Sequence, residues 1–165
     1  MDQTLREILW KQFGASIDMF ENSIKACPDK LWDSDRNPLF WYTAYHTLFF
    51  LDYYLSEEPD KFHPPEPFIL SEFNSDGEMP ERTYTREEIL KYVDHCRKKC
   101  HDHIAGMTAE KAAERFINPY RNYSVLETLL YNMRHVQHHG AQLNLLLRQG
   151  GIEPPDWVSQ TKISL

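Results

Sequence analysis

The segment from Arg134 to Gln142 carries the side chains best suited to chemistry, and it reads RHVQHHGAQ. Two of its histidines, His135 and His139, are four residues apart, so on a helix they lie on one face about one turn from each other. Paired imidazoles at this spacing can bind one transition metal, as the histidines of the HExxH motif do. The glutamate of that motif is absent here, which excludes a zinc protease of that type. The pair therefore predicts part of a metal site that needs at least one further ligand.

The neighbours of the pair favour a binding site over a plain core helix. On a helical wheel, most residues within about a sixth of a turn of His135 are polar. This group comprises His139, Gln142, Thr128, Tyr131, Asn132 and Leu146. His138 is predicted to lean toward water. Helical histidine pairs are also common as core or surface residues with ordinary hydrogen bonds, and from this helix alone that alternative stays open.

A third histidine, His46, offers the missing ligand from a second helix. It lies between Asn37 and about Leu55, where nearly every residue is apolar or aromatic. An isolated charge in such a segment is costly, whereas a neutral imidazole bound to a cation is not. A core histidine hydrogen-bonded to a tyrosine is the alternative, and the pair on the other helix favours the metal. Because a helix that is apolar all round is either central or covered by another subunit, we predict a homodimer with this helix near the contact.

Apolar periodicity and helix-start signals predict an all-α protein. Helices are expected from Thr4 to Cys27, from Asn37-Pro38 to about Leu55, from Thr85 to about Ile104 and from Ser124 to Gln149, with a short helix from Thr108 to Arg115. Thr85 and Ser124 each begin a capping box. The whole chain, residues 1–165, is predicted to be a single domain built as a four-helix bundle.

Two segments outside the helices complete the predicted architecture. Residues 56–84 contain several prolines and form a crossover between the second and third helices that is too long for a simple connection. We expect this crossover to pack on the bundle and to roof the site. The C-terminal tail after Gly150-Gly151 is expected to be extended, with Trp157 and Val158 as its anchors.

Other potential ligands form weaker alternatives. Cys96, Cys100 and His103 have the spacing of soft metal ligands along one helix face, which makes them the main rival site. Both cysteines fall on the apolar stripe that the core requires, so we expect them in the core. His63 and Glu66, in the crossover, could approach a metal, although we expect surface positions for both.

Composition narrows the class of protein further. With 41% hydrophobic and 26% charged residues the chain is globular, and its formal charge of -7 without any basic run argues against nucleic acids and anionic membranes as partners. No run approaches the roughly 20 apolar residues of a membrane span. Three cysteines without a framework spacing favour a reducing compartment, so we expect a cytoplasmic protein.

The sequence resembles the DinB-like (DinB/YfiT-like) superfamily of four-helix-bundle proteins, which are regarded as metalloenzymes. The resemblance covers nearly the whole chain and rests on YHTLFFLD around His46 and RHVQHHGAQL around His135 and His139. It implies that these three histidines bind a divalent metal, for which zinc and nickel are suitable. Many members have His-Arg-Gly-Gln where residues 139–142 read HGAQ here, so any anion contact of that arginine is missing from this helix.

The resemblance also implies an activity. Similar proteins include transferases and isomerases that depend on low-molecular-weight thiols, so we expect transfer or isomerisation with a thiol at an open coordination position, and hydrolysis as the second reaction class. Tyr42, Tyr45, Gln142 and His138 are the candidates for the substrate pocket, and no general base is assigned. The alternative from another class is a non-catalytic dimeric bundle that binds a metal or a small ligand in a stress response.

Overall fold

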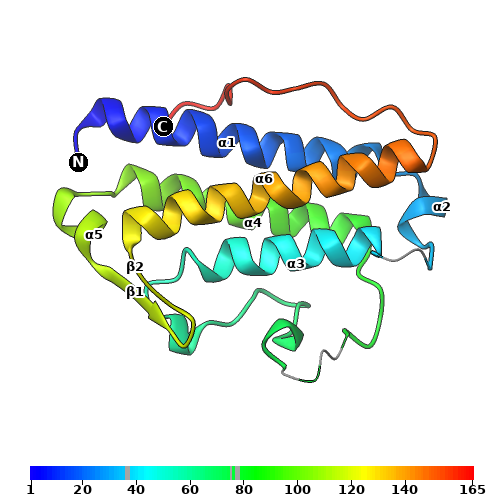
Figure 1. Ribbon diagram of the computed structural model, residues 1–165, viewed down its shortest axis with the longest axis horizontal. Coiled ribbons are helices and arrows are strands. Elements are labelled where there is room, and N and C mark those ends of the chain that lie inside the picture. The colour runs from blue at the N-terminus through cyan, green and yellow to red at the C-terminus, as the bar shows by residue number, and fades with distance from the viewer. Residues whose placement is uncertain (36–37, 75, 77–78) are drawn as a thin grey trace.

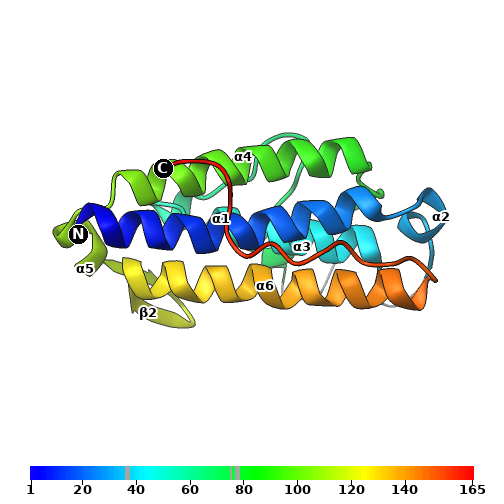
Figure 2. The same ribbon diagram turned by 90° about the horizontal axis from the view of Figure 1, so that it is seen from above.

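The computed structural model describes residues 1–35, 38–74, 76 and 79–165. Its elements are α1 (Gln3–Ala26), α2 (Asp29–Trp32), α3 (Phe40–Tyr53), α4 (Arg86–Ala105), α5 (Ala109–Ala113), β1 (Arg115–Asn118), β2 (Arg121–Ser124) and α6 (Val125–Gln149), with 3-10 turns η1 (Pro59–Lys61) and η2 (Ser71–Phe73) (Figure 1). The four long helices α1, α3, α4 and α6 form a bundle, in which α1 and α3 each pack against both α4 and α6 (Figures 1 and 2). The predicted all-α bundle is confirmed.

The direction of the helices explains the long crossover. The Cys96 thiol of α4 contacts the Leu48 carbonyl of α3, and about one turn further along both helices Lys99 bonds to Asp52. Helices α3 and α4 therefore run in the same direction, so the chain must return along the bundle between them. The described residues between 54 and 85 make this return beneath α3 in the view of Figure 1.

The crossover covers the outer side of α3. Phe68 stacks on Tyr45 of α3 and on Tyr92 of α4, with ring centroids 5.9 and 4.4 Å apart, and Phe62 meets Phe49 edge to face. As a result no residue of α3 is exposed. The apolar character of this helix is thus accounted for within one chain, and a homodimer stays a prediction that the composition of α3 no longer requires.

The predicted helix starts agree with the observed caps where both can be compared. Thr85 and Glu88 form a reciprocal capping box at α4, and the Ser124 hydroxyl accepts a hydrogen bond from the Glu127 amide at α6. The predicted cap at Asn37 lies outside the described residues. Helix α3 begins at Phe40, later than the sequence indicated, and its preceding residue Leu39 provides no side-chain cap.

A β-hairpin between α5 and α6 was not predicted. The short helix ends at Ala113 instead of Arg115, because Arg115 pairs with Ser124 at the open end of an antiparallel ladder. A tight connection at Pro119-Tyr120 joins the two strands. The hairpin packs Phe116 on Tyr53, with ring centroids 5.6 Å apart, so it borders the end of α3. The sequence reads this region only as a proline-terminated helix, because each strand is four residues long and without clear alternation.

The C-terminal tail runs back along α1 and is anchored differently from the prediction (Figure 2). The Thr161 amide donates to the Lys11 carbonyl at 3.0 Å, and the Trp10 indole donates to the Ile163 carbonyl at 2.8 Å. Gly14 permits this approach, since a Cβ there would lie 2.5 Å from Thr161 Cγ2. Trp157, by contrast, is 70% exposed, so the predicted anchor at that residue is wrong. None of the helices in the described part of the chain has an apolar stretch long enough to span a bilayer.

Candidate metal centre

The three histidines singled out in the sequence lie together between α3 and α6. The ring centroid of His46 is 5.5 Å from that of His135 and 4.8 Å from that of His139, and the two rings on α6 are 4.5 Å apart. One nitrogen from each ring can be chosen so that all three lie within 4.8 Å of one another, and the cluster could hold a metal ion. The buried Asn132 fixes the register of the two helices, because its amide donates to the Leu51 carbonyl at 3.0 Å.

The protein holds the two histidines of α6 in the form that binds metals. Burial, reinforced by the neighbouring histidines, lowers the pKa of His135 to about 3. Burial also lowers the pKa of His139, to about 4, against an opposing effect of the Gln142 hydrogen bond. Both rings are therefore neutral near pH 7, and neutral imidazole is the form that coordinates a cation. The Nδ1 atom of His135 is buried and has no hydrogen-bond partner among the described residues, so the donor set fits a metal ion.

Two neighbouring side chains orient the other two rings. His46 Nδ1 lies 2.7 Å from a Glu72 carboxylate oxygen, and His139 Nδ1 lies 2.6 Å from the Gln142 side-chain oxygen. Because both partners are acceptors, each Nδ1 carries the proton and donates it. The Nε2 atoms of His46 and His139 are then left with lone pairs for a cation. A carboxylate or amide behind a ligating histidine commonly fixes its tautomer and ring orientation.

Glu72 is the residue of this site that the sequence analysis missed. It belongs to η2, in the crossover that was predicted to roof the site, and only 5% of its side chain is exposed. The candidates considered in that segment, His63 and Glu66, are both exposed, and neither belongs to the cluster. A usable signal was the position of Glu72 beside Phe73 and close to Leu70, where a lone acid among apolar residues requires a partner.

The four predicted substrate-pocket residues have different surroundings. Tyr45 is fully buried and donates to the Ile69 carbonyl at 2.5 Å, so it is a core residue that does not line the site. Tyr42 lies 6.4 Å from the His46 ring, and burial together with the Glu72 carboxylate raises its pKa. Gln142 contacts His139 and, at 3.3 Å, the exposed His138. Gln142 therefore supports a histidine of the cluster, and His138 lies at its edge.

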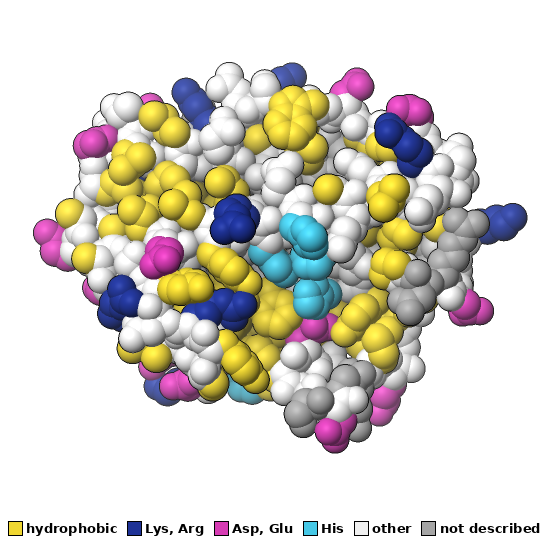
Figure 3. Space-filling model, viewed as in Figure 1, with side chains coloured by type: hydrophobic (Ala, Val, Ile, Leu, Met, Phe, Trp, Pro, Cys, Tyr) yellow, Lys and Arg dark blue, Asp and Glu magenta, His cyan; other side chains and the backbone are white. Residues whose placement is uncertain are grey.

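A cavity of about 800 Å³ opens beside the histidine cluster. Six aromatic side chains line it; they are Phe50, Tyr53, Tyr54, Phe73, Tyr120 and Tyr131. Its charged side chains are Glu72, Asp60 and Arg121. On this face of the molecule a group of histidine side chains reaches the surface and is bordered by hydrophobic and basic side chains (Figure 3). The cavity gives a small molecule access to the cluster, and its walls suit an apolar body.

The rival cysteine site does not form. Cys96 and Cys100 are fully buried in the core, and burial raises the pKa of both thiols, which disfavours the thiolate that a metal would bind. Within the residues that the structure describes, His46, His135 and His139 are the one group of three potential ligands close enough to share an ion. His103 lies elsewhere, on a cavity between α4 and the start of the crossover.

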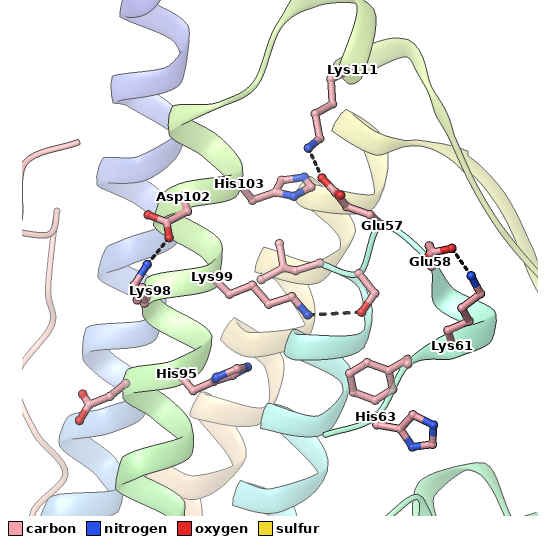
Figure 4. Close-up of a pocket in the computed structure, with 14 residues that line it drawn as sticks. Glu57, Glu58, Lys61, His63, His95, Lys98, Lys99, Asp102, His103 and Lys111 are labelled. Carbon is pink, nitrogen blue, oxygen red and sulfur yellow. Dashed lines mark hydrogen bonds and ion pairs between the residues drawn. The ribbon is translucent and has the colours of Figure 1, made fainter. Parts of the chain in front are cut away.

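This second cavity, of about 940 Å³, is lined by lysines and acids that pair with one another (Figure 4). Lys61 pairs with Glu58, Lys98 with Asp102 and Lys111 with Glu57. Behind them Lys99 bonds to the buried Asp52 at 2.5 Å. Burial alone would raise the pKa of Asp52, but the hydrogen bond to His95 and the charge of Lys99 outweigh it and lower that pKa. Each lysine that lines this cavity is thus paired with an acid, so the described residues present no free ammonium group there to bind a ligand.

The fold and the site together define a class: a four-helix bundle with a three-histidine cluster, supplied by two adjacent helices, that faces an aromatic cavity. The family model of the DinB superfamily matches residues 12–143, which include all three histidines. The chain therefore belongs to the DinB superfamily. A search of curated proteins found no match to the sequence.

Proposed function

We propose that the chain binds one divalent metal ion through His46, His135 and His139 and is a metal-dependent enzyme that acts on a small molecule in the adjoining cavity. The observation that supports this most is the convergence of three ring nitrogens within 4.8 Å beside a cavity of about 800 Å³. A site for structure alone would be closed by a fourth protein ligand, whereas a catalytic site keeps a position open. Within the described residues the cluster has three potential ligands and no fourth.

The proposed ion is zinc or nickel, both of which accept imidazole ligands. Bound there, it would supply Lewis acidity and lower the pKa of a group at its open position. Residues of the chain orient the proposed ligands: Glu72 holds the ring of His46, and Gln142 holds the ring of His139. Phe50 and Tyr54 pack on His135, with ring centroids 5.8 and 6.2 Å away, and limit the access of water from that side.

The reaction class we propose first is transfer or isomerisation with a low-molecular-weight thiol, with hydrolysis second. The resemblance to thiol-dependent members of the superfamily supports this order. In addition, the cavity is large enough for a thiol and a second small molecule together, since drug-sized sites span roughly 300 to 1,000 Å³. Glu72 Oε1 is buried and makes no hydrogen bond within the described part of the chain, which makes it the candidate acceptor for a proton.

Turnover by the metal-loaded protein tests the function. The zinc-loaded and nickel-loaded forms would be incubated with glutathione, bacillithiol or mycothiol and a panel of electrophiles, and separately with esters and amides. Only in samples that carry metal do we expect turnover: a transfer consumes free thiol and releases the leaving group, an isomerisation converts the electrophile and returns the thiol, and a hydrolysis cleaves the ester or amide with water. Metal-free protein is the control. A fully loaded protein that turned over none of these compounds would support the alternative, a bundle that binds metal without catalysis.

Glu72→Gln is expected to weaken metal binding tenfold to about a hundredfold, the range that removal of an outer partner of a metal-bound histidine usually gives. The amide keeps the size of the side chain but loses the negative charge that makes His46 a better ligand. Metal competition against a chromophoric chelator measures the affinity. Glu66→Gln is the matched control, since it changes an exposed acid of the same crossover and should leave the affinity unchanged. Equal affinities for the two variants would remove Glu72 from the site.

A further inference from the structure

Among the described residues, Arg121 faces the cavity of the candidate metal centre and has no carboxylate partner. Arg121, the first residue of β2, donates from Nη2 to the Tyr131 hydroxyl at 2.7 Å. Its guanidinium carbon lies 4.7 Å from the centre of the Tyr131 ring and 5.6 Å from that of Tyr54. These contacts hold the guanidinium against two aromatic rings in the wall of the cavity.

None of the described acids near Arg121 pairs with its guanidinium, so the group can bind an anion. Asp60 and Glu72 also line the cavity, but neither forms an ion pair with Arg121, and no other carboxylate does so within the described residues. Glu72 is already bonded to His46. Elsewhere in the bundle a half-buried arginine such as Arg97 is matched by two acids, Asp18 and Glu21. The planar fork of a guanidinium is suited to a carboxylate, which it can bind through two parallel hydrogen bonds.

The position of Arg121 relative to the histidines sets the size of the ligand. Tyr54 links the two groups, because its ring lies 5.6 Å from the guanidinium carbon and 6.2 Å from the His135 ring. Both Arg121 and His135 line the same cavity, and the wall between them is aromatic. A flat organic acid of about the size of a substituted benzene could therefore reach from one to the other.

We propose that the cavity takes small organic acids with a flat apolar body, whose carboxylate is bound by Arg121 while the opposite end faces His46, His135 and His139. This inference rests on the proposed function for the identity of the reactive end. Tyr131 positions Arg121, and the aromatic wall receives the body of the acid. An amide of the same shape would lack the charge and would lose the paired hydrogen bonds to the guanidinium.

The test compares trans-cinnamate with its neutral amide, trans-cinnamamide, as probes of the metal-free protein by calorimetric titration. Removal of the metal ensures that the carboxylate cannot bind to the ion instead. We expect the acid to bind at least tenfold more tightly than the amide, and Arg121→Gln to abolish this difference. Arg115→Gln is the matched control, because Arg115 lies on the other strand of the hairpin and bonds to Asn122 instead of lining this cavity. Arg121→Lys should recover part of the preference.

Each outcome bears on one proposal. If Arg121→Gln keeps the wild-type preference, or if the wild-type protein binds acid and amide equally, the assignment of Arg121 is overturned even when metal binds to the histidines. If the preference depends on Arg121 but no metal binds, the proposed function fails while the anion site stands. Circular dichroism and thermal unfolding of each variant separate loss of binding from loss of fold.

Discussion

Replacement of His135 with alanine is expected to lower the affinity for zinc or nickel by more than about a hundredfold. Loss of an outer partner of a ligand costs roughly 10- to 100-fold, and loss of a ligand itself should cost more. Burial lowers the pKa of His135 to about 3, so the ring is neutral near pH 7 and needs no deprotonation before it binds the proposed ion. Its replacement leaves His46 and His139 as an incomplete pair. Equilibrium dialysis followed by elemental analysis gives the metal content per chain.

His138→Ala is the matched control for this prediction. His138 is on the same helix and next to His139, but it is exposed and contacts Gln142 at 3.3 Å instead of joining the cluster. Its loss should change metal affinity by less than about threefold, well below the effect of an outer partner. If His138→Ala lowered the metal content as much as His135→Ala, the assignment of the two ligands of α6 to residues 135 and 139 would be wrong. If neither variant lost metal, the ion would be bound elsewhere.

Lys99→Met is expected to lower the free energy of unfolding by about 3 kcal/mol, because it leaves a buried carboxylate without its cation. Lys99 of α4 bonds to Asp52 of α3 at 2.5 Å, and the Asp52 side chain is 1% exposed. The Asp52 carboxylate keeps Tyr92 at 3.0 Å and His95 at 3.5 Å as partners. The expected loss in the free energy of unfolding therefore lies at the lower end of the range for a broken buried ion pair. Chemical denaturation of the metal-free protein measures it.

Lys98→Met provides the comparison for Lys99. Lys98 is the adjacent residue and pairs with Asp102, but its side chain is 79% exposed, and exposed pairs contribute about 0 to 1 kcal/mol. The double variant Lys99→Met with Asp52→Asn removes the uncompensated charge and should recover much of the stability. A cost below about 1 kcal/mol for Lys99→Met would mean that Asp52 does not depend on its lysine.

The sequence predicted the parts of the site that lie on regular helices. The spacing of His135 and His139 is a property of one helix, and the apolar surroundings of His46 indicated a second. Their convergence requires that α3 and α6 be neighbours in the register that the Asn132 bond to Leu51 fixes, as they are. The bundle, the capping box at Thr85 and the cap at Ser124 were predictable for the same reason, because they depend on residues three to four positions apart, although at Ser124 only the bond from the Glu127 amide to the hydroxyl is formed.

The parts that the sequence did not predict depend on contacts between distant segments. Glu72 reaches His46 from an irregular crossover, and no periodicity indicates which acid of such a segment turns inward. Arg121 enters the cavity from a hairpin whose strands are too short to show alternation. Tyr45 was expected at the pocket, yet Ile69 and Ser71 of the crossover hold its hydroxyl in the core.

The most direct test of the central claim is X-ray absorption spectroscopy of the zinc-loaded protein in a buffer without thiols. The account predicts nitrogen or oxygen neighbours at about 2.0 to 2.1 Å, with the outer-shell scattering of imidazole rings from His46, His135 and His139. When His135 is replaced, the outer-shell signal should decrease in proportion to the loss of one of the three imidazole rings. Sulfur neighbours at about 2.3 Å would contradict the account, because they would place the ion on the cysteines instead of between α3 and α6.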